Sequence, residues 1–266
     1  MKTHFFNTAV AIALIAAVAG STGVNAADEK PAFTINTRWV DASVIIADDL
    51  RTFPGLFENL LPEGRRDASQ FRVVADKDRK DLPKDAFEGG RKFTYERGYT
   101  QRSEIGHYVS VLRSDYTDGL GAHPNHNYDT IVWDVTAKKR ISIRPFFTET
   151  ADDGPTMRAL AMAIRAALVT EKKARDSYIE EDNGLDAIKP KILSLGALAL
   201  APSNEANKSS GLITYFSPYS VGSYAEGSYT LFVPWTAFKD RLSPEGAALF
   251  GGERPKADAE KDNDNN

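Results

Sequence analysis

Apolar and polar residues alternate in several short segments of the chain, which is the pattern of strands that bury one face. The first such segment is FTINTRW at 33–39, and its apolar residues lie at every second position. Similar segments follow, most of them separated by turn-like sequences, at about 93–95, 108–112, 128–133, 141–143, 192–200, 212–216 and 228–233. Strands that succeed one another with short turns pair antiparallel, so we predict a mainly antiparallel sheet.

Helical spacing of apolar residues marks the remaining segments. Residues 53–61 form the first predicted helix, and a weaker pattern predicts a second one at 63–79. The clearest helix follows Asp152 and Asp153 and has Pro155 near its first position, where proline is well tolerated. Its predicted buried face is Met157, Leu160, Ala161, Ile164, Ala167 and Leu168. Helices segregated between runs of strands predict an α+β fold, in which helices cover one face of the antiparallel sheet.

The two ends of the chain differ in character from the interior. Residues 1–26 have Lys2, an apolar run at about 9–19 and small residues up to Ala26, which is the pattern of a cleaved secretory signal peptide. Residues 251–266 are acidic and lack aromatic residues, so we predict a disordered tail. Between them we predict two intimately packed subdomains, an N-terminal α+β unit at 27–104 and a C-terminal one at 105–250.

Composition narrows the range of functions. The 266 residues include no cysteine, so the core alone must stabilise the fold. The formal net charge is −4 and no basic cluster is visible, which argues against a nucleic-acid partner. No segment after the signal peptide has the roughly 20 apolar residues that a membrane span requires. We therefore expect a periplasmic or secreted protein, and no motif indicates a cofactor.

The sequence GLGAHPNHNY at 119–128 contains two of the chain's four histidines. Glycines that can adopt positive φ and a proline that restricts its neighbour predict a turn between strands. A zinc site would need further ligands such as Asp118 or Asp129 beside His123 and His126, and no zinc-binding motif is present. We therefore expect the two histidines to shape the turn and contact a ligand rather than bind a metal ion. The alternative is that His123 or His126 acts as a general acid or base.

The segment YFSPYSVGSYAEGSYTLFVPW at 215–235 is unusually rich in aromatic residues. Tyrosine combines a large rigid face with one polar group, so tyrosine clusters are common at binding surfaces. Part of this segment is expected to be core on the last strands, whereas residues 217–227 are too irregular for a strand and predict an aromatic loop. No nucleophile elbow, phosphate-binding loop or metalloprotease motif accompanies it.

These two segments together carry a family resemblance. YTDGLGAHPN at 116–125, WDV at 133–135, RPFF at 144–147, GLITYFSPYSVGSYAEG at 211–227 and VPW at 233–235 resemble the RsiV-like extracytoplasmic domain. That domain is the lysozyme-sensing part of an anti-sigma factor, and similar modules are appended to cell-wall polysaccharide deacetylases. This sequence shows neither a second membrane-directed segment nor deacetylase metal motifs, so the resemblance implies the binding module alone, with an α+β fold.

The combined expectation is a non-catalytic envelope binding protein whose partner is a lysozyme-like muramidase or a peptidoglycan-derived glycan. The predicted ligand-binding residues are His123, Asn125, Tyr215, Tyr219 and Tyr224. The alternative is an enzyme that acts on envelope polysaccharide with His123 or His126 as acid or base.

Overall fold

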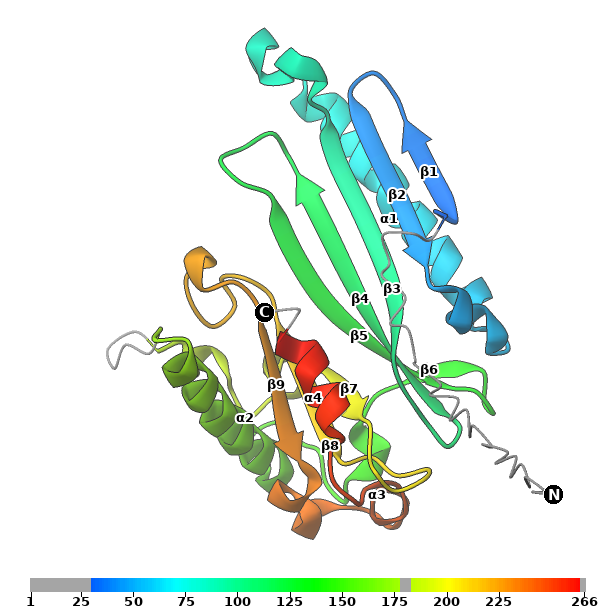
Figure 1. The fold of residues 1–266 in the computed structure, drawn as a ribbon, viewed down its shortest axis with the longest axis vertical. Helices are drawn as coiled ribbons and strands as arrows, with labels where there is room; N and C mark the ends of the chain where they lie inside the picture. The colour runs from blue at the N-terminus through cyan, green and yellow to red at the C-terminus, as the bar shows by residue number, and fades with distance from the viewer. Residues whose placement is uncertain (1–29, 178–182, 264–266) are drawn as a thin grey trace, which may run out of the picture.

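The computed structural model describes residues 30–177 and 183–263, and the predicted signal peptide lies outside the described residues. Two sheets dominate the fold, one with six strands in the order β1-β2-β3-β4-β5-β6 and one with the order β7-β8-β9 (Figure 1). The strands are β1 Phe33–Asn36, β2 Val40–Ile46, β3 Phe93–Ile105, β4 Tyr108–Asp118, β5 Asn125–Asp134, β6 Lys139–Ile141, β7 Ala197–Ala201, β8 Gly211–Phe216 and β9 Tyr229–Pro234. The α-helices are α1 Leu56–Asp78, α2 Pro155–Ala174, α3 Pro244–Leu249 and α4 Lys256–Asn263.

The α+β prediction is confirmed, and the pairing in the six-stranded sheet is antiparallel except between β2 and β3. That one parallel pair follows from helix α1, which crosses over between the two strands and covers one face of the sheet (Figure 1). The predicted boundary between residues 104 and 105 lies within the β3–β4 hairpin. The strands of the large sheet end with β6, and those of the small sheet begin with β7.

Helix α1 corrects the prediction of two helices at 53–61 and 63–79. Pro62 lies inside it and removes one backbone hydrogen bond, but the helix continues because residues on both sides of Pro62 pack on the sheet. Leu60 is fully buried, and Gly64 approaches β2 so closely that a Cβ on it would lie 2.6 Å from the Cγ1 atom of Val44. Ala68 and Ala75 extend the same contact towards the end of the helix.

The smaller sheet is docked by its edge strand β7 on the other face of the large sheet. Hydroxyl groups of the large sheet complete the hydrogen bonding of β7: Ser103 donates to the carbonyl of Leu200 at 2.7 Å, and Ser110 accepts from the N–H of the same residue at 3.1 Å. Thr130 donates to the carbonyl of Leu198 at 2.7 Å. An unpaired strand edge is costly when it is buried, so these hydroxyls fix how the sheets sit together.

Helix α2 covers β9 and begins at Pro155 as predicted. Its buried residues include Met157, Leu160, Ile164 and Leu168, which pack into the larger hydrophobic core with the buried side of β8 and β9. Its N-cap is Gly154, without a side-chain cap, so neither Asp152 nor Asp153, which precede it, caps the helix. Within the described residues, the longest helices are too polar to span a bilayer.

The predicted disordered tail is wrong over residues 256–263, which form helix α4. Arg102 on β3, whose side chain is 9% exposed, forms a bidentate pair with Asp258 at 2.6 and 2.9 Å and reaches Asp262 at 3.3 Å. Arg254 pairs with the same two carboxylates at 2.7 and 2.5 Å. Composition predicted disorder because the tail has little apolar surface, but paired buried charges hold it in place.

Arg102→Met should detach α4 and destabilise the protein by about 3 kcal/mol, because two buried carboxylates lose a guanidinium that they share. Urea denaturation and hydrogen exchange of the α4 amides measure the two effects. Arg72→Met is the matched control, since Arg72 and its partner Asp76 are 51% and 47% exposed and an exposed pair contributes little. Equal losses in the two variants would contradict the proposed role of Arg102.

Candidate functional site

Three of the predicted ligand-binding residues meet, although His123 is 96 positions from Tyr219 in the chain. His123, in the β4–β5 turn, stacks on Tyr224 with ring centroids 3.8 Å apart and an interplanar angle of 23°. Tyr219 completes the group, 5.4 Å from Tyr224 and 6.1 Å from His123 between ring centroids. We call His123, Tyr219 and Tyr224 the aromatic cluster. It joins the tip of the β4–β5 hairpin to the loop between β8 and β9, which is orange in Figure 1.

Hydrogen bonds fix the rings relative to one another. The hydroxyl of Tyr224 donates to the carbonyl of Pro124 at 2.8 Å, and His123 Nδ1 lies 2.9 Å from the same oxygen. A carbonyl can only accept, so Nδ1 carries a proton, and Nε2 in the neutral ring accepts from the hydroxyl of Tyr219 at 3.2 Å. Both nitrogens of His123 therefore have protein partners.

The hairpin tip is a turn, as the sequence predicted, but Leu120 rather than a glycine supplies the positive φ. Its φ is 62°, its N–H donates to Asp118 Oδ1 at 2.7 Å, and its side chain is only 9% exposed. Because Leu120 packs into the core beneath α1, it ties the tip down. His123 thus projects from a turn that is anchored on the core.

Tyr219 has unusual geometry for a bulky residue. Its φ is 69° and its side chain is 61% exposed, so an unfavourable backbone conformation presents an aromatic ring to solvent. Left-handed backbone costs a residue with a side chain about 1 kcal/mol or more. The start of the loop is held where Ser217 Oγ accepts from the N–H of Tyr128 at 2.9 Å. Strain of this kind is common where a side chain is displayed for contact.

The end of the loop is held by a buried ion pair. Tyr224 lies in a 3₁₀ turn, Tyr224–Glu226, that Ser223 and Glu226 close as a capping box. Glu226 accepts from Lys172 of α2 at 2.6 Å, and Lys172 is fully buried. Burial alone disfavours the charged carboxylate, but its hydrogen bonds, led by that from Lys172, outweigh this and lower the pKa of Glu226 to about 2.

The remaining predicted residues lie outside the aromatic cluster. Tyr215 is 5% exposed, and its hydroxyl accepts from Arg102 at 2.7 Å, so it supports the docking of α4 and is not available to a ligand. Burial raises the pKa of Tyr215 to about 12. Asn125 is exposed at the start of β5. His126 is also exposed and packs edge-on to Tyr116, with centroids 5.1 Å apart.

Sequence reasoning missed Lys172 and Glu226, on which the position of the loop depends. A signal for Glu226 was present, because SYAE at 223–226 has the spacing of a capping box. Lys172 carried none, since a lysine near a helix C-terminus is ordinarily solvated. Lys172 is buried and paired with Glu226 only because the fold places helix α2 against the β8–β9 loop.

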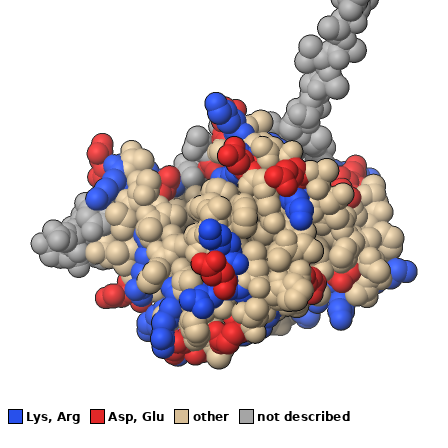
Figure 2. Space-filling model, turned by 90° about the horizontal axis from the view of Figure 1, so that it is seen from below, with Lys and Arg blue, Asp and Glu red and all other residues tan. Residues whose placement is uncertain are grey.

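The aromatic cluster presents ring faces and hydroxyl groups at the surface. Among the described residues no group of His, Asp and Glu is arranged to hold a metal ion, and the ring nitrogens of His123 are already hydrogen bonded. Figure 2 shows basic and acidic side chains interspersed over the face that it displays, without a field of one sign. Rigid, partly exposed rings with hydroxyl groups suit contact with a sugar ring or with the surface of another protein.

Residues 150–236 match the family described as "Protein of unknown function (DUF3298)". A DUF3298 family protein from Pseudomonas aeruginosa PAO1 has a similar crystal structure, with 17% identity, a TM-score of 0.50, and coverage of 80% of this chain and 88% of that chain. A DUF3298 member from Bacteroides fragilis NCTC 9343 gives 12% identity and a TM-score of 0.47, covering 78% and 87% of the two chains. No curated protein is significantly similar. The Pseudomonas structure establishes likeness of fold, and the family match includes Tyr219 and Tyr224.

Glu226→Gln should lower stability at neutral pH by on the order of 2 kcal/mol, because buried Lys172 loses its counter-charge. The pKa of Glu226 is lowered from 4.5 to about 2, so its stabilising effect is complete above pH 4.5 and is lost as the pH falls towards 2. The difference in melting temperature between the two proteins should therefore shrink over that window. Glu104→Gln, at an exposed position of β3, is the control and should show no such closing difference.

Tyr219→Gly should be more stable than Tyr219→Ala by about 1 kcal/mol, since glycine adopts the φ of this position without steric cost. Both variants lose the same ring, so the comparison isolates the backbone strain. Urea denaturation of the pair provides the measurement. An alanine variant as stable as the glycine variant would show that residue 219 is not strained.

Proposed function

We propose that this chain, whose residues 150–236 match the DUF3298 family, is an exported, non-catalytic binding protein of the cell envelope. Its ligand is a lysozyme-like muramidase or a glycan derived from peptidoglycan. His123, Tyr219 and Tyr224 make the contact, with Asn125 beside them at the start of β5. The signal-peptide pattern supports export, and the RsiV-like resemblance supports this choice of ligand.

The aromatic cluster is the observation that carries the proposal. Tyr219 is among the few large side chains with apolar surface that remain exposed in the described residues, at 61%. Its ring is held in advance by the strained backbone and by the hydrogen bond to His123. A ring that is already ordered loses little conformational entropy on binding, which favours its use as an anchor.

Anchoring from behind gives the cluster a rigid support. The hairpin tip is tied to the core by Leu120, and the loop is tied to α2 by Lys172 and Glu226. Contact surfaces built on fixed elements keep their geometry when the ligand arrives. The net charge of −4 also complements a basic muramidase, which would make association sensitive to salt.

Calorimetry of residues 27–266 with a c-type lysozyme, at low and high salt, tests the protein arm of the proposal. We expect a salt-sensitive interaction with a Kd below about 1 µM, equivalent to roughly −8 kcal/mol. Oligosaccharides of N-acetylglucosamine and soluble muropeptides, titrated in parallel, test the glycan arm. Residues 251–263 must be kept in the protein, because α4 is part of the fold.

Tyr219→Ala should weaken binding at least about tenfold, as expected for an aromatic anchor. Met162→Ala is the matched control, because Met162 is 68% exposed on α2 and lies outside the cluster. Absence of heat with every probe would reject the proposal. An equal loss in the control would show that the cluster is not the contact surface.

The same preparation distinguishes the enzymatic alternative. If His123 or His126 acts as a general acid or base, alanine at that position should abolish release of reducing sugar from peptidoglycan while leaving the melting temperature nearly unchanged. A binding protein releases none in any variant.

A further inference from the structure

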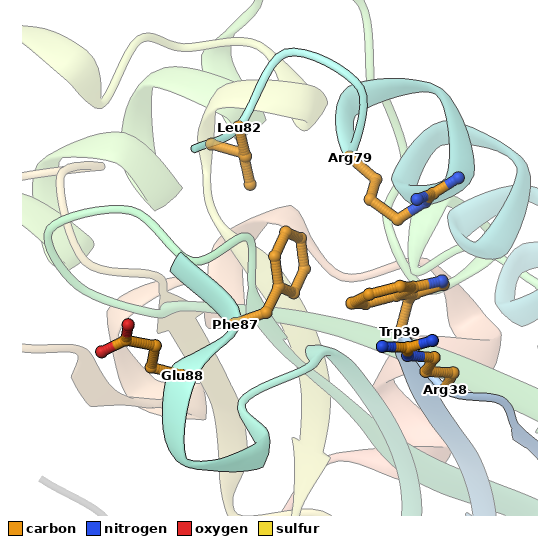
Figure 3. Close-up of a pocket in the computed structure, with 6 residues that line it drawn as sticks. All are labelled: Arg38, Trp39, Arg79, Leu82, Phe87 and Glu88. Atoms are coloured by element: carbon orange, nitrogen blue, oxygen red, sulfur yellow. The ribbon is translucent and has the colours of Figure 1, made fainter. Parts of the chain in front are cut away.

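A second concave site lies at the C-terminal end of α1. Its lining residues are distant in sequence from those of the aromatic cluster. The cavity has a volume of about 540 Å³, within the range of small-molecule sites. It is formed by the β1–β2 turn, the end of α1 and the following 3₁₀ segment, Lys84–Gly90. Its lining residues are Arg38, Trp39, Arg79, Leu82, Phe87 and Glu88 (Figure 3).

An arginine pair around one indole is the main feature of this cavity. Trp39 lies between the guanidinium groups of Arg38 and Arg79, which are 4.5 and 5.1 Å from its ring centroid (Figure 3). Phe87 meets the indole edge-on, with centroids 5.0 Å apart. A guanidinium that stacks on an aromatic face is held in orientation while its N–H edges remain open to an acceptor.

Neither guanidinium has a carboxylate within ion-pair distance in residues 30–177 and 183–263. In contrast, Arg97, Arg102 and Arg113 each contact two or more carboxylates. Arg79 Nε is also buried without a hydrogen-bond partner in the described part of the chain. An atom closed to solvent cannot contact a ligand, so an incoming anion would be attracted by the two unpaired guanidinium charges and not by this N–H group.

The rest of the lining defines the body of the ligand. Leu82 and Phe87 form the wall that faces the arginine pair in Figure 3. Glu88 is the single acidic residue of the lining, so two arginines and one glutamate leave a net charge of about one positive. A ligand with one negative charge and an apolar portion would match this distribution.

We propose that this cavity binds a small monocarboxylate with an apolar body, the carboxylate attracted by the positive charges of Arg38 and Arg79 on the two faces of Trp39 and the body lying against Leu82 and Phe87. The site belongs to the six-stranded sheet and its helix, outside residues 150–236 that match the DUF3298 family. It does not depend on the function of the aromatic cluster. An acyl chain and a peptide C-terminus are two sources of this chemistry.

Paired probes test the charge and distinguish the sources. Octanoate represents the acyl chain and N-acetyl-phenylalanine the peptide end, and each is compared with its neutral amide by titration of residues 27–266. We expect at least one acid to bind about tenfold or more tightly than its amide. The fluorescence of Trp39 should report binding, and Trp39→Phe should remove that signal, because the other tryptophans, Trp133 and Trp235, do not line the cavity.

Arg38→Gln and Arg79→Gln should each reduce the preference for acid over amide by about tenfold. Arg38 is exposed, so its variant remains folded even if Arg79→Gln loosens the end of α1. Arg91→Gln is the matched control, since Arg91 is also exposed and near in sequence but does not line the cavity. Equal binding of acid and amide, an equal loss in the control, or no binding of either acid would overturn the proposal.

Discussion

The docking of strand β7 on the face of the six-stranded sheet is the constraint on which the rest of the structure depends. A strand edge buried against another sheet must find donors and acceptors, and here Ser103, Ser110 and Thr130 supply them. Because hydrogen bonds are directional, they fix the position of the small sheet along the large one. That position brings the β8–β9 loop to the tip of the β4–β5 hairpin, and the aromatic cluster exists only where the two meet.

Buried cations with carboxylate partners secure the elements that surround this docking. Arg97 ties α1 to the sheet through Asp67 and Asp115, each at 2.6 Å, and Arg102 and Lys172 hold α4 and the β8–β9 loop. A buried charge is tolerated only when its partner is in place, so each pair is disrupted if its element moves. The net contribution of such a buried ion pair to the stability of the fold is small, but breaking the pair is costly. These pairs therefore favour one placement of each element over others.

The aromatic cluster and the arginine cavity satisfy their polar groups differently. In the cluster, the ring nitrogens of His123 and the hydroxyl of Tyr224 are engaged within the protein, so ring faces are what it offers to a ligand. In the cavity, the guanidinium groups of Arg38 and Arg79 have no carboxylate within ion-pair distance among the described residues. The first site therefore suits contact through shape and apolar surface, and the second suits a ligand that brings a negative charge.

Local sequence was sufficient for most elements, because periodicity and turn residues act within a few positions. It determined α2 from Pro155 onwards, the strands other than β2, which no prediction included, the turn that carries His123 and the irregular loop that carries Tyr219 and Tyr224. Pairing between distant elements decided the rest. Helix α1 continues past Pro62 because it packs on β2. The tail is ordered because its carboxylates pair with Arg102, and Tyr215 is buried in the folded protein. His123 lies beside Tyr224 because the two sheets dock on each other. The contacts between the sheets join residues that are far apart in the chain, so a local sequence pattern cannot predict them.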